Sequence, residues 1–187
     1  MRVLAGVLAA ALVLVGCGVP LQDEPAPIEP QAIPSRLQSP GGPTAAPSAA
    51  RTTVQVNFVR KDRLVSFARE VPGAGVLDGV IQALTAGPTA SEQANGITSA
   101  LPPGIALTVV VVQGTTVGLE LSGETDGRSP TENVLAVGQI VLSVTALETV
   151  DQVTFWRDGS PVEALLADGA LTTAPLTAAD YEALRSP

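Results

Sequence analysis

The clearest pattern in the chain is an alternation of apolar and polar residues between positions 54 and 69. Apolar residues occupy positions 54, 56 and 58, and the same period of two recurs between 64 and 69. Period-two alternation is typical of a half-buried strand, because successive side chains point to opposite faces. The charged run at 60–63 separates the two segments, so the pattern predicts a β-hairpin.

Two other segments have the periodicity of helices. Apolar residues three and four positions apart predict an amphipathic helix over 75–85, ended by Gly87 and Pro88. A capping box (Ser or Thr, with Glu three residues later) starts a short helical turn at Thr89 and a longer helix at Ser129. That longer helix runs to about residue 148 and is apolar nearly all round, which predicts a central helix covered on more than one side.

The remaining apolar runs predict further strands. Residues 105–113 and 116–122 flank a Gly-Thr turn, and residues 152–156 and 162–165 flank an Asp-Gly turn. A capping pattern that begins at Thr177 predicts a short terminal helix. The predicted fold class is therefore α+β, with strands paired as local hairpins around two main helices.

The N-terminus begins like that of an exported protein. Arg2 precedes an uncharged apolar stretch over 3–15, which is shorter than the roughly 20 residues that a spanning helix needs. Residues 14–17 then resemble a bacterial lipobox that ends in Gly16 and Cys17, the only cysteine of the chain. We expect residues 1–16 to be a signal peptide cleaved between Gly16 and Cys17. The resemblance implies diacylglyceryl and N-acyl groups on Cys17; the alternative is a buried thiol.

Residues 17–51 have the composition of a spacer. Eight of the 16 prolines fall there, with no aromatic residue and no apolar periodicity. Too little apolar surface is present to offset the entropy of ordering this segment, and proline favours extended backbone. We therefore expect a lipidated Cys17 followed by a Pro-rich disordered tether, and then one domain over 52–187.

Six blocks of this domain together resemble the signature of the GerMN domain family. The resemblance covers about residues 53–166, the expected core, and leaves 167–187 as a C-terminal tail that holds the short helix. In chain order the blocks are RLVSFAR (63–69), LTAGPT (84–89) with Glu92 and Gly96 behind it, SALPPG (99–104), VGLELS (117–122), VGQIVLSVT (137–145) and VTFWRDGSPV (153–162).

GerMN domains occur in sporulation and germination proteins and in actinobacterial envelope lipoproteins. The resemblance implies a compact α+β fold, akin to the ring-building domains of secretion complexes. It also implies a non-catalytic interaction role outside the cytoplasmic membrane.

Composition excludes several kinds of chemistry. The chain has no histidine, which rules out Ser-His-Asp and Cys-His catalysis and His-based metal sites. The strongest catalytic candidates are Glu120, Glu124 and Asp126, which could hydrolyse a glycosidic bond or hold a weak calcium ion. Their spacing does not fit an EF-hand, and a carboxylate-rich loop between a strand and a helix is typical of solvated surface. We expect no enzyme activity, no cofactor and no metal site.

Two places are candidates for an interaction site. Gly87, Pro88, Thr89 and Glu92 could form a partner-binding corner, although a helix stop followed by a capped turn explains them better. Trp156 follows Phe155 on a predicted strand, so one ring should face the core and the other outward. An outward Trp156 would be either an interface anchor or a partly covered edge residue.

Gln139 lies inside the otherwise apolar second helix. We interpret it as the partner of a backbone group from a neighbouring strand rather than as a ligand-binding residue, because buried amides need hydrogen-bond partners.

Charge and anchoring limit the possible partners. The chain carries 18 acidic against 10 basic residues, a balance that disfavours nucleic acid. We expect the lipid bilayer as one partner, through Cys17, and an envelope protein as the other, on the extracytoplasmic face of the cell membrane. The alternative is a lipoprotein that binds or senses a small ligand or a cell-wall glycan.

Overall fold

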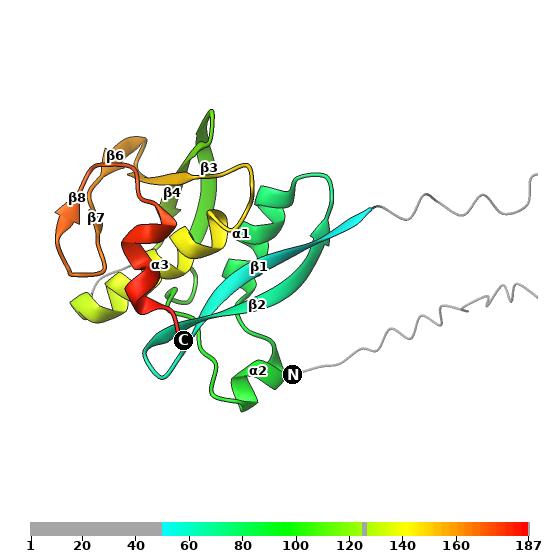
Figure 1. The fold of residues 1–187 in the computed structure, drawn as a ribbon. Coiled ribbons are helices and arrows are strands. Elements are labelled where there is room, and N and C mark those ends of the chain that lie inside the picture. Colours follow the sequence, from blue (N-terminus) through cyan, green and yellow to red (C-terminus); the bar gives the residue numbers. More distant parts are fainter. Residues whose placement is uncertain (1–49, 125–126, 187) are drawn as a thin grey trace, which may run out of the picture. The chain divides into compact units, whose positions relative to one another are not determined.

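The structure is a computed structural model that describes residues 50–124 and 127–186. The expected signal peptide, Cys17 and nearly all of the expected tether lie outside the described residues, as does Asp126 of the acidic loop. Figure 1 shows the fold, with each element labelled. No described helix is long and apolar enough to cross a bilayer.

The first hairpin pairs β1 (Arg51–Arg60) with β2 (Arg63–Pro72) over the full length of both strands. Its turn residues Lys61 and Asp62 have left-handed backbone, with φ of 49° and 59°, which suits the twist of a two-residue hairpin turn. The hairpin predicted from the alternation is confirmed. Arg51, which the sequence placed in the tether, is the first residue of β1.

A four-stranded sheet has the order β3 (Ala106–Gln113), β4 (Thr116–Ser122), β5 (Gln152–Arg157) and β6 (Ser160–Val162). The predicted local hairpins are present as β1–β2, β3–β4 and β5–β6, but β4 and β5 also pair in parallel, which the hairpin pattern did not predict. A parallel pair needs a crossover connection, and the chain makes it through the long helix α3 (Pro130–Val144).

Capping boxes predicted the starts of two helices, and Gly87 predicted the end of a third. Helix α1 (Val76–Ala86) ends at Gly87, α2 (Ala90–Ala94) is capped by Thr89, and α3 (Pro130–Val144) is capped by Ser129. Helix α3 stops four residues before the predicted end at 148. The Thr145 hydroxyl donates to the Val141 carbonyl oxygen at 2.7 Å, and the chain then turns toward β5.

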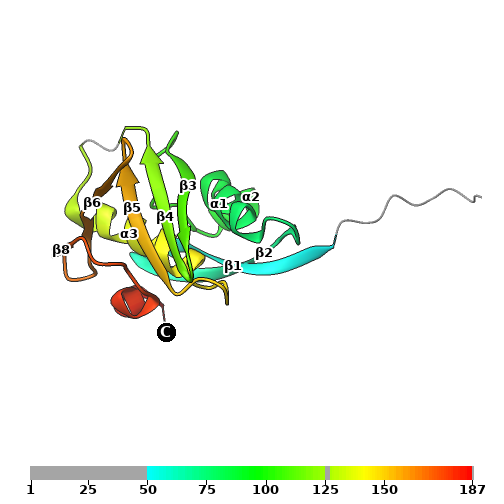
Figure 2. The same cartoon turned by 90° about the horizontal axis from the view of Figure 1, so that it is seen from above.

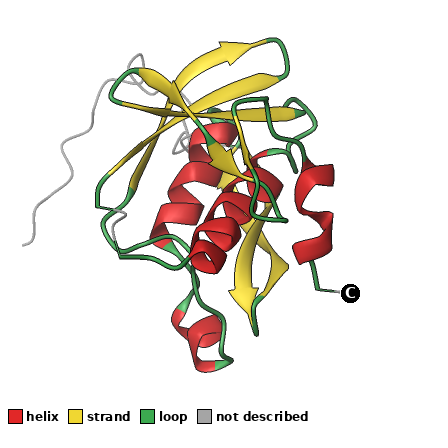
Figure 3. Ribbon diagram, turned by 90° about the vertical axis from the view of Figure 1, so that its left-hand side faces the viewer, coloured by secondary structure: helices red, strands yellow, loops and turns green. Residues whose placement is uncertain are grey.

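Helices α1 and α3 lie between the hairpin and the four-stranded sheet, as Figures 2 and 3 show. Helix α3 contacts β1 and β2 on one side and β5 on the other. This two-sided cover explains why its surface is apolar nearly all round, and confirms the predicted central helix. Its fully buried residues include Ile140, Val141, Leu142 and Val144.

The C-terminal segment departs from the prediction in two ways. The expected return strand at 162–165 is divided between β6 and β7 (Ala164–Leu165), and β7 pairs with β8 (Leu171–Thr172) in a separate two-stranded sheet. The terminal helix is a 3-10 helix, η1 (Ala178–Leu184). Its Tyr181 is fully buried and donates to the Leu165 carbonyl oxygen at 2.7 Å, so residues beyond 166 complete the core.

Close packing of α1 on the hairpin depends on Gly79. A β-carbon built at Gly79 would lie 2.6 Å from the β-carbon of Val71, which is itself only 5% exposed. The nearest atom belongs to the root of a branched side chain on a strand, so the helix or the strand would have to shift to accept it.

We expect Gly79→Ala to lower the free energy of unfolding by about 1–2 kcal/mol, because the clash outweighs the helix propensity of about 1 kcal/mol that alanine adds. Urea melts measure the change. Gly138→Ala in α3 is the matched control and should cost less, because its nearest neighbours at 3.0–3.1 Å are side-chain atoms of Leu184, Tyr181 and Leu64. Equal or higher stability of Gly79→Ala would contradict the close approach of α1 and β2.

Candidate functional site

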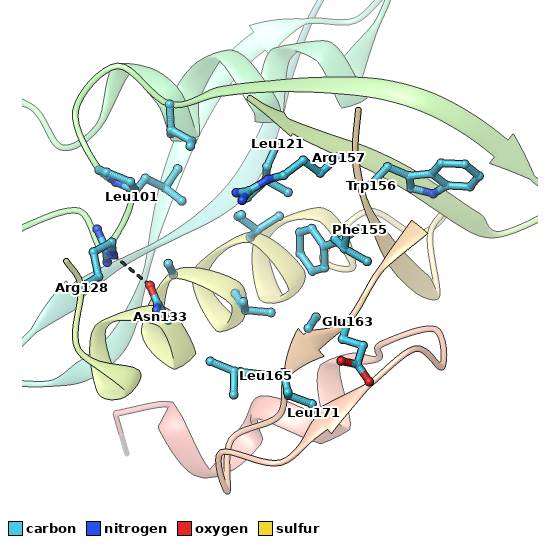
Figure 4. Close-up of a pocket in the computed structure, with 17 residues that line it drawn as sticks. Leu101, Leu121, Arg128, Asn133, Phe155, Trp156, Arg157, Glu163, Leu165 and Leu171 are labelled. Carbon is cyan, nitrogen blue, oxygen red and sulfur yellow. Dashed lines mark hydrogen bonds between the residues drawn. The ribbon is translucent and has the colours of Figure 1, made fainter. Parts of the chain in front are cut away.

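An apolar groove of about 270 Å³ opens between the four-stranded sheet and the N-terminal half of α3. Its walls come from the loop before β3, the ends of β4 and β5, and the strands β6 to β8 (Figure 4). We call this hollow the groove. Its apolar lining residues include Leu101, Ile105, Leu121, Val137, Ile140, Phe155, Val162, Leu165 and Leu171, and its charged lining residues are Arg128, Arg157 and Glu163.

The β4–α3–β5 unit places the groove. Because β4 and β5 are parallel, their carboxyl ends meet at one edge of the sheet, beside the start of α3. Leu121 and Arg157 project from these strand ends, and Figure 4 shows the Arg157 guanidinium over the middle of the groove. Crevices at the carboxyl ends of parallel strands are common ligand sites in α/β proteins.

Arg128 forms a fixed wall at one end of the groove. Its guanidinium donates to Asn133 Oδ1 at 3.0 Å and to the carbonyl oxygens of Ala100 at 2.5 Å and Glu132 at 3.1 Å. These bonds tie the loop before β3 to the first turn of α3. Arg128 therefore gives the groove both its shape and a positive charge.

Phe155 and Trp156 point to opposite faces of the sheet, as their alternation predicted. Phe155 is 4% exposed and lies against α3 beneath the groove, whereas the Trp156 indole turns away from α3 (Figure 4). The indole Nε1 donates to Thr154 Oγ1 at 3.2 Å. Gly118 makes room for the ring, because a β-carbon there would lie 2.8 Å from Nε1. The role of half-buried Trp156 as an interface anchor stays a prediction.

The corner at 87–92 is bonded inside the domain. Gly87 ends α1 with a φ of 77°, and Thr89 and Glu92 form the complete capping box of α2. The Glu92 carboxylate also accepts two bonds from Arg69, at 3.0 and 2.6 Å. This geometry is that of a helix stop and a capped turn. Binding of a partner at Gly87, Pro88, Thr89 and Glu92 remains a prediction.

Arg69 joins this corner to the hairpin. Its guanidinium carbon lies 5.4 Å from the centre of the Phe58 ring and 5.9 Å from that of Phe67, within cation–π range. The side chains of Arg69 and Glu92 are only 19% and 16% exposed. The ion pair thus holds α2 against β2 from a largely covered position.

The acidic residues at 120–126 have different surroundings. Glu120 accepts a hydrogen bond from the Gly159 amide at 2.9 Å and so supports the β5–β6 turn. Glu124 is exposed, and Asp126 lies outside the described residues. Within 50–124 and 127–186, no three Asp, Glu, His or Cys side chains are grouped to hold a metal ion.

Gln139 bonds to a backbone group, as expected, but that group belongs to a loop rather than to a strand. Its side-chain oxygen accepts from the Ala100 amide at 2.7 Å, and its nitrogen donates to Ser99 Oγ at 3.1 Å. No sequence pattern indicates the groove, because its lining comes from separate segments whose meeting depends on the β4–α3–β5 crossover.

Comparison with solved structures identifies the class of fold. The chain is similar to the first GerMN domain of the sporulation protein GerM from Bacillus subtilis, with a TM-score of 0.55, 18% identity, and coverage of 67% of this chain and 97% of that one. The tandem GerMN domains of the same protein give a TM-score of 0.55 and 16% identity over 68% of this chain. The present chain spans only 46% of that tandem protein. The shared fold is the α+β fold of a GerMN domain.

Residues 41–163 match the Germane family, described as sporulation and spore germination. Because this match covers more than half of the chain, the protein belongs to that family. The expected GerMN resemblance is confirmed. A comparison with curated proteins gives no match.

We expect Glu92→Gln to lower the free energy of unfolding by about 2 kcal/mol at neutral pH, because it removes the charge that faces a largely covered Arg69. The bonds from Arg69 hold the pKa of Glu92 below its ordinary 4.5. The stabilisation is therefore fully present above about pH 4.5 and is lost as the pH falls through the lowered pKa.

Urea melts at neutral and acid pH test this dependence. Glu70→Gln is the control, because Glu70 and Arg51 are 4.0 Å apart with side chains 68% exposed, and a pair of this kind contributes at most about 1 kcal/mol. The role of the Arg69–Glu92 pair would be contradicted if both variants lowered the free energy of unfolding equally, or if the effect of Glu92→Gln persisted at low pH.

Proposed function

We propose that the chain is a membrane-anchored, extracytoplasmic lipoprotein whose GerMN domain is a non-catalytic interaction module for an envelope protein. The observation that carries the interaction role is the groove, an open apolar hollow that is lined by side chains from both the sheet and α3. The lipobox at 14–17 supports the anchor.

The groove suits an apolar segment of a partner protein with an acidic residue beside it. Its floor is built from Leu, Ile, Val and Phe side chains, which favour burial of an apolar side chain. Arg128 adds positive charge at one end of the groove, in a domain that is acidic overall. Complementary charge of this kind orients a partner and favours an acidic one.

The alternative of a cell-wall glycan fits the groove less well. Sugar rings commonly stack on exposed aromatic faces, whereas Phe155 is 4% exposed and the Trp156 indole is turned away from the hollow. A small apolar ligand remains the second candidate, because a hollow of about 270 Å³ is close to the lower size of small-molecule sites.

Cys17→Ser should abolish lipid attachment and release the protein from the membrane, because the apolar stretch at 3–15 is too short to span the bilayer. Metabolic labelling with palmitate and fractionation of cells measure both effects. Ser35→Ala in the expected tether is the control and should stay labelled and membrane-bound. Labelled palmitate on Cys17→Ser would contradict the anchor.

A photo-crosslinking residue at Leu171 tests the groove. This position is 60% exposed, so the change should leave the fold intact. In intact cells we expect one discrete adduct with another envelope protein, identified by mass spectrometry, and no such adduct from exposed Gln55 on β1. Identical adducts from both positions, or no protein adduct at Leu171, would contradict the proposed interaction. Loss of the adduct on adding a small-molecule extract would favour the ligand alternative.

A further inference from the structure

Strand β3 has an open edge. It forms one end of the four-stranded sheet and pairs with β4 alone. Within the described residues, Ala106–Gln113 makes no other backbone hydrogen bond and no side-chain hydrogen bond. The backbone groups on its outer side are therefore available to another strand. The β3–β4 hairpin extends beyond α1 toward its turn (Figure 1), so the second half of this edge is clear of the helix.

This edge is apolar and increasingly exposed toward the turn. Leu107 is 7% exposed, but Val110 is 40% and Val112 is 63% exposed, and these two are among the few large apolar side chains exposed in the described part of the chain. A β-bulge between Val109 and Val111 bends the strand, so its pairing with β4 changes register at Val110.

The edge also lacks the charges that normally protect an end strand. Residues 93–119 contain no Asp, Glu, Lys or Arg, although the chain as a whole has 18 acidic and 10 basic residues. Natural edge strands commonly carry lysine or proline, which prevents another strand from pairing with them. Strand β3 carries neither residue.

We propose that two copies of this chain associate through the second half of β3, by antiparallel pairing of the two edges around a two-fold axis near Val111. Each copy then presents the same strand to the other, as a two-fold interface requires. In this register Val112 of one copy lies opposite Val110 of the other, and both exposed valines become covered.

The absence of charge along this edge permits a second copy as its occupant. Two acidic domains repel each other over most of their surface, and the uncharged β3 edge is where they can approach without like-charge contacts. The contact is small compared with the roughly 1,200 Å² of a standard interface, so we expect a weak, concentration-dependent dimer in solution. Anchoring both copies to one membrane would raise their effective concentration; only this last step rests on the proposed function.

Cysteine crosslinking in cell envelopes tests the pairing with the full chain. Val110→Cys should give a crosslinked dimer with a short bismaleimide, well above the background of the wild-type chain. Adding Val112→Lys should lower the dimer yield at least tenfold, because it places like charges across the interface. Val112→Thr, which is neutral and of similar shape, should retain the dimer. Leu171→Lys is the matched control for an exposed apolar residue, 60% against 63% exposed, and should also retain it.

The proposal would be overturned if Val110→Cys gave no more crosslinked dimer than the wild-type chain. It would also be overturned if Leu171→Lys lowered the dimer yield as much as Val112→Lys does. A crosslink from Val110→Cys to a different protein, in place of a second copy, would overturn it as well. Sedimentation of the full chain in detergent gives an independent measurement, in which the dimer fraction should rise with concentration and fall with Val112→Lys. The groove adduct at Leu171 does not depend on any of these outcomes.

Discussion

Helix α3 is buried on two opposite sides, and the rest of the domain is assembled around that constraint. The hairpin and the four-stranded sheet are separate sheets in the described part of the chain, so they are joined mainly through the helices between them. The only cysteine is residue 17, so no internal disulfide supports the fold. A domain of this size is stable by only about 5–15 kcal/mol. The apolar surface of α3 therefore contributes to both halves of the core at once.

Three buried polar residues set the position of α3 between its neighbours. The Ser143 hydroxyl accepts from the backbone amide of Asn57 in β1 at 2.8 Å and donates to the backbone carbonyl oxygen of Gln139 at 2.6 Å. The Gln139 side chain binds the loop before β3 through Ala100 and Ser99. A shift of the helix along its axis would leave buried polar groups without partners, at a cost of about 1–3 kcal/mol each. Apolar burial thus supplies most of the stability, and these hydrogen bonds select one position of α3 along its axis.

The features that could be predicted from sequence are those with a local cause. The capping boxes at Thr89 and Ser129 and the Lys61–Asp62 turn each depend on a few adjacent residues. The parallel pairing of β4 and β5, the division of the 162–165 strand and the groove depend on which distant segments meet, and no short pattern encodes that. We expect residues 167–187 to be a tail because the family signature ends before them, yet Tyr181 is fully buried.

The two proposed contact surfaces use different parts of the four-stranded sheet. The groove includes Leu101 and Ile105, which precede β3, whereas the proposed pairing uses the half of β3 that approaches the β3–β4 turn. Strand β1, near the start of the described residues, belongs to the other layer of the fold. Pairing of two β3 edges would therefore leave both grooves open. Together with the proposed lipid anchor, a dimer of this kind would present two identical grooves on one membrane. A partner with two matching segments would then bind the dimer more tightly than it binds one domain.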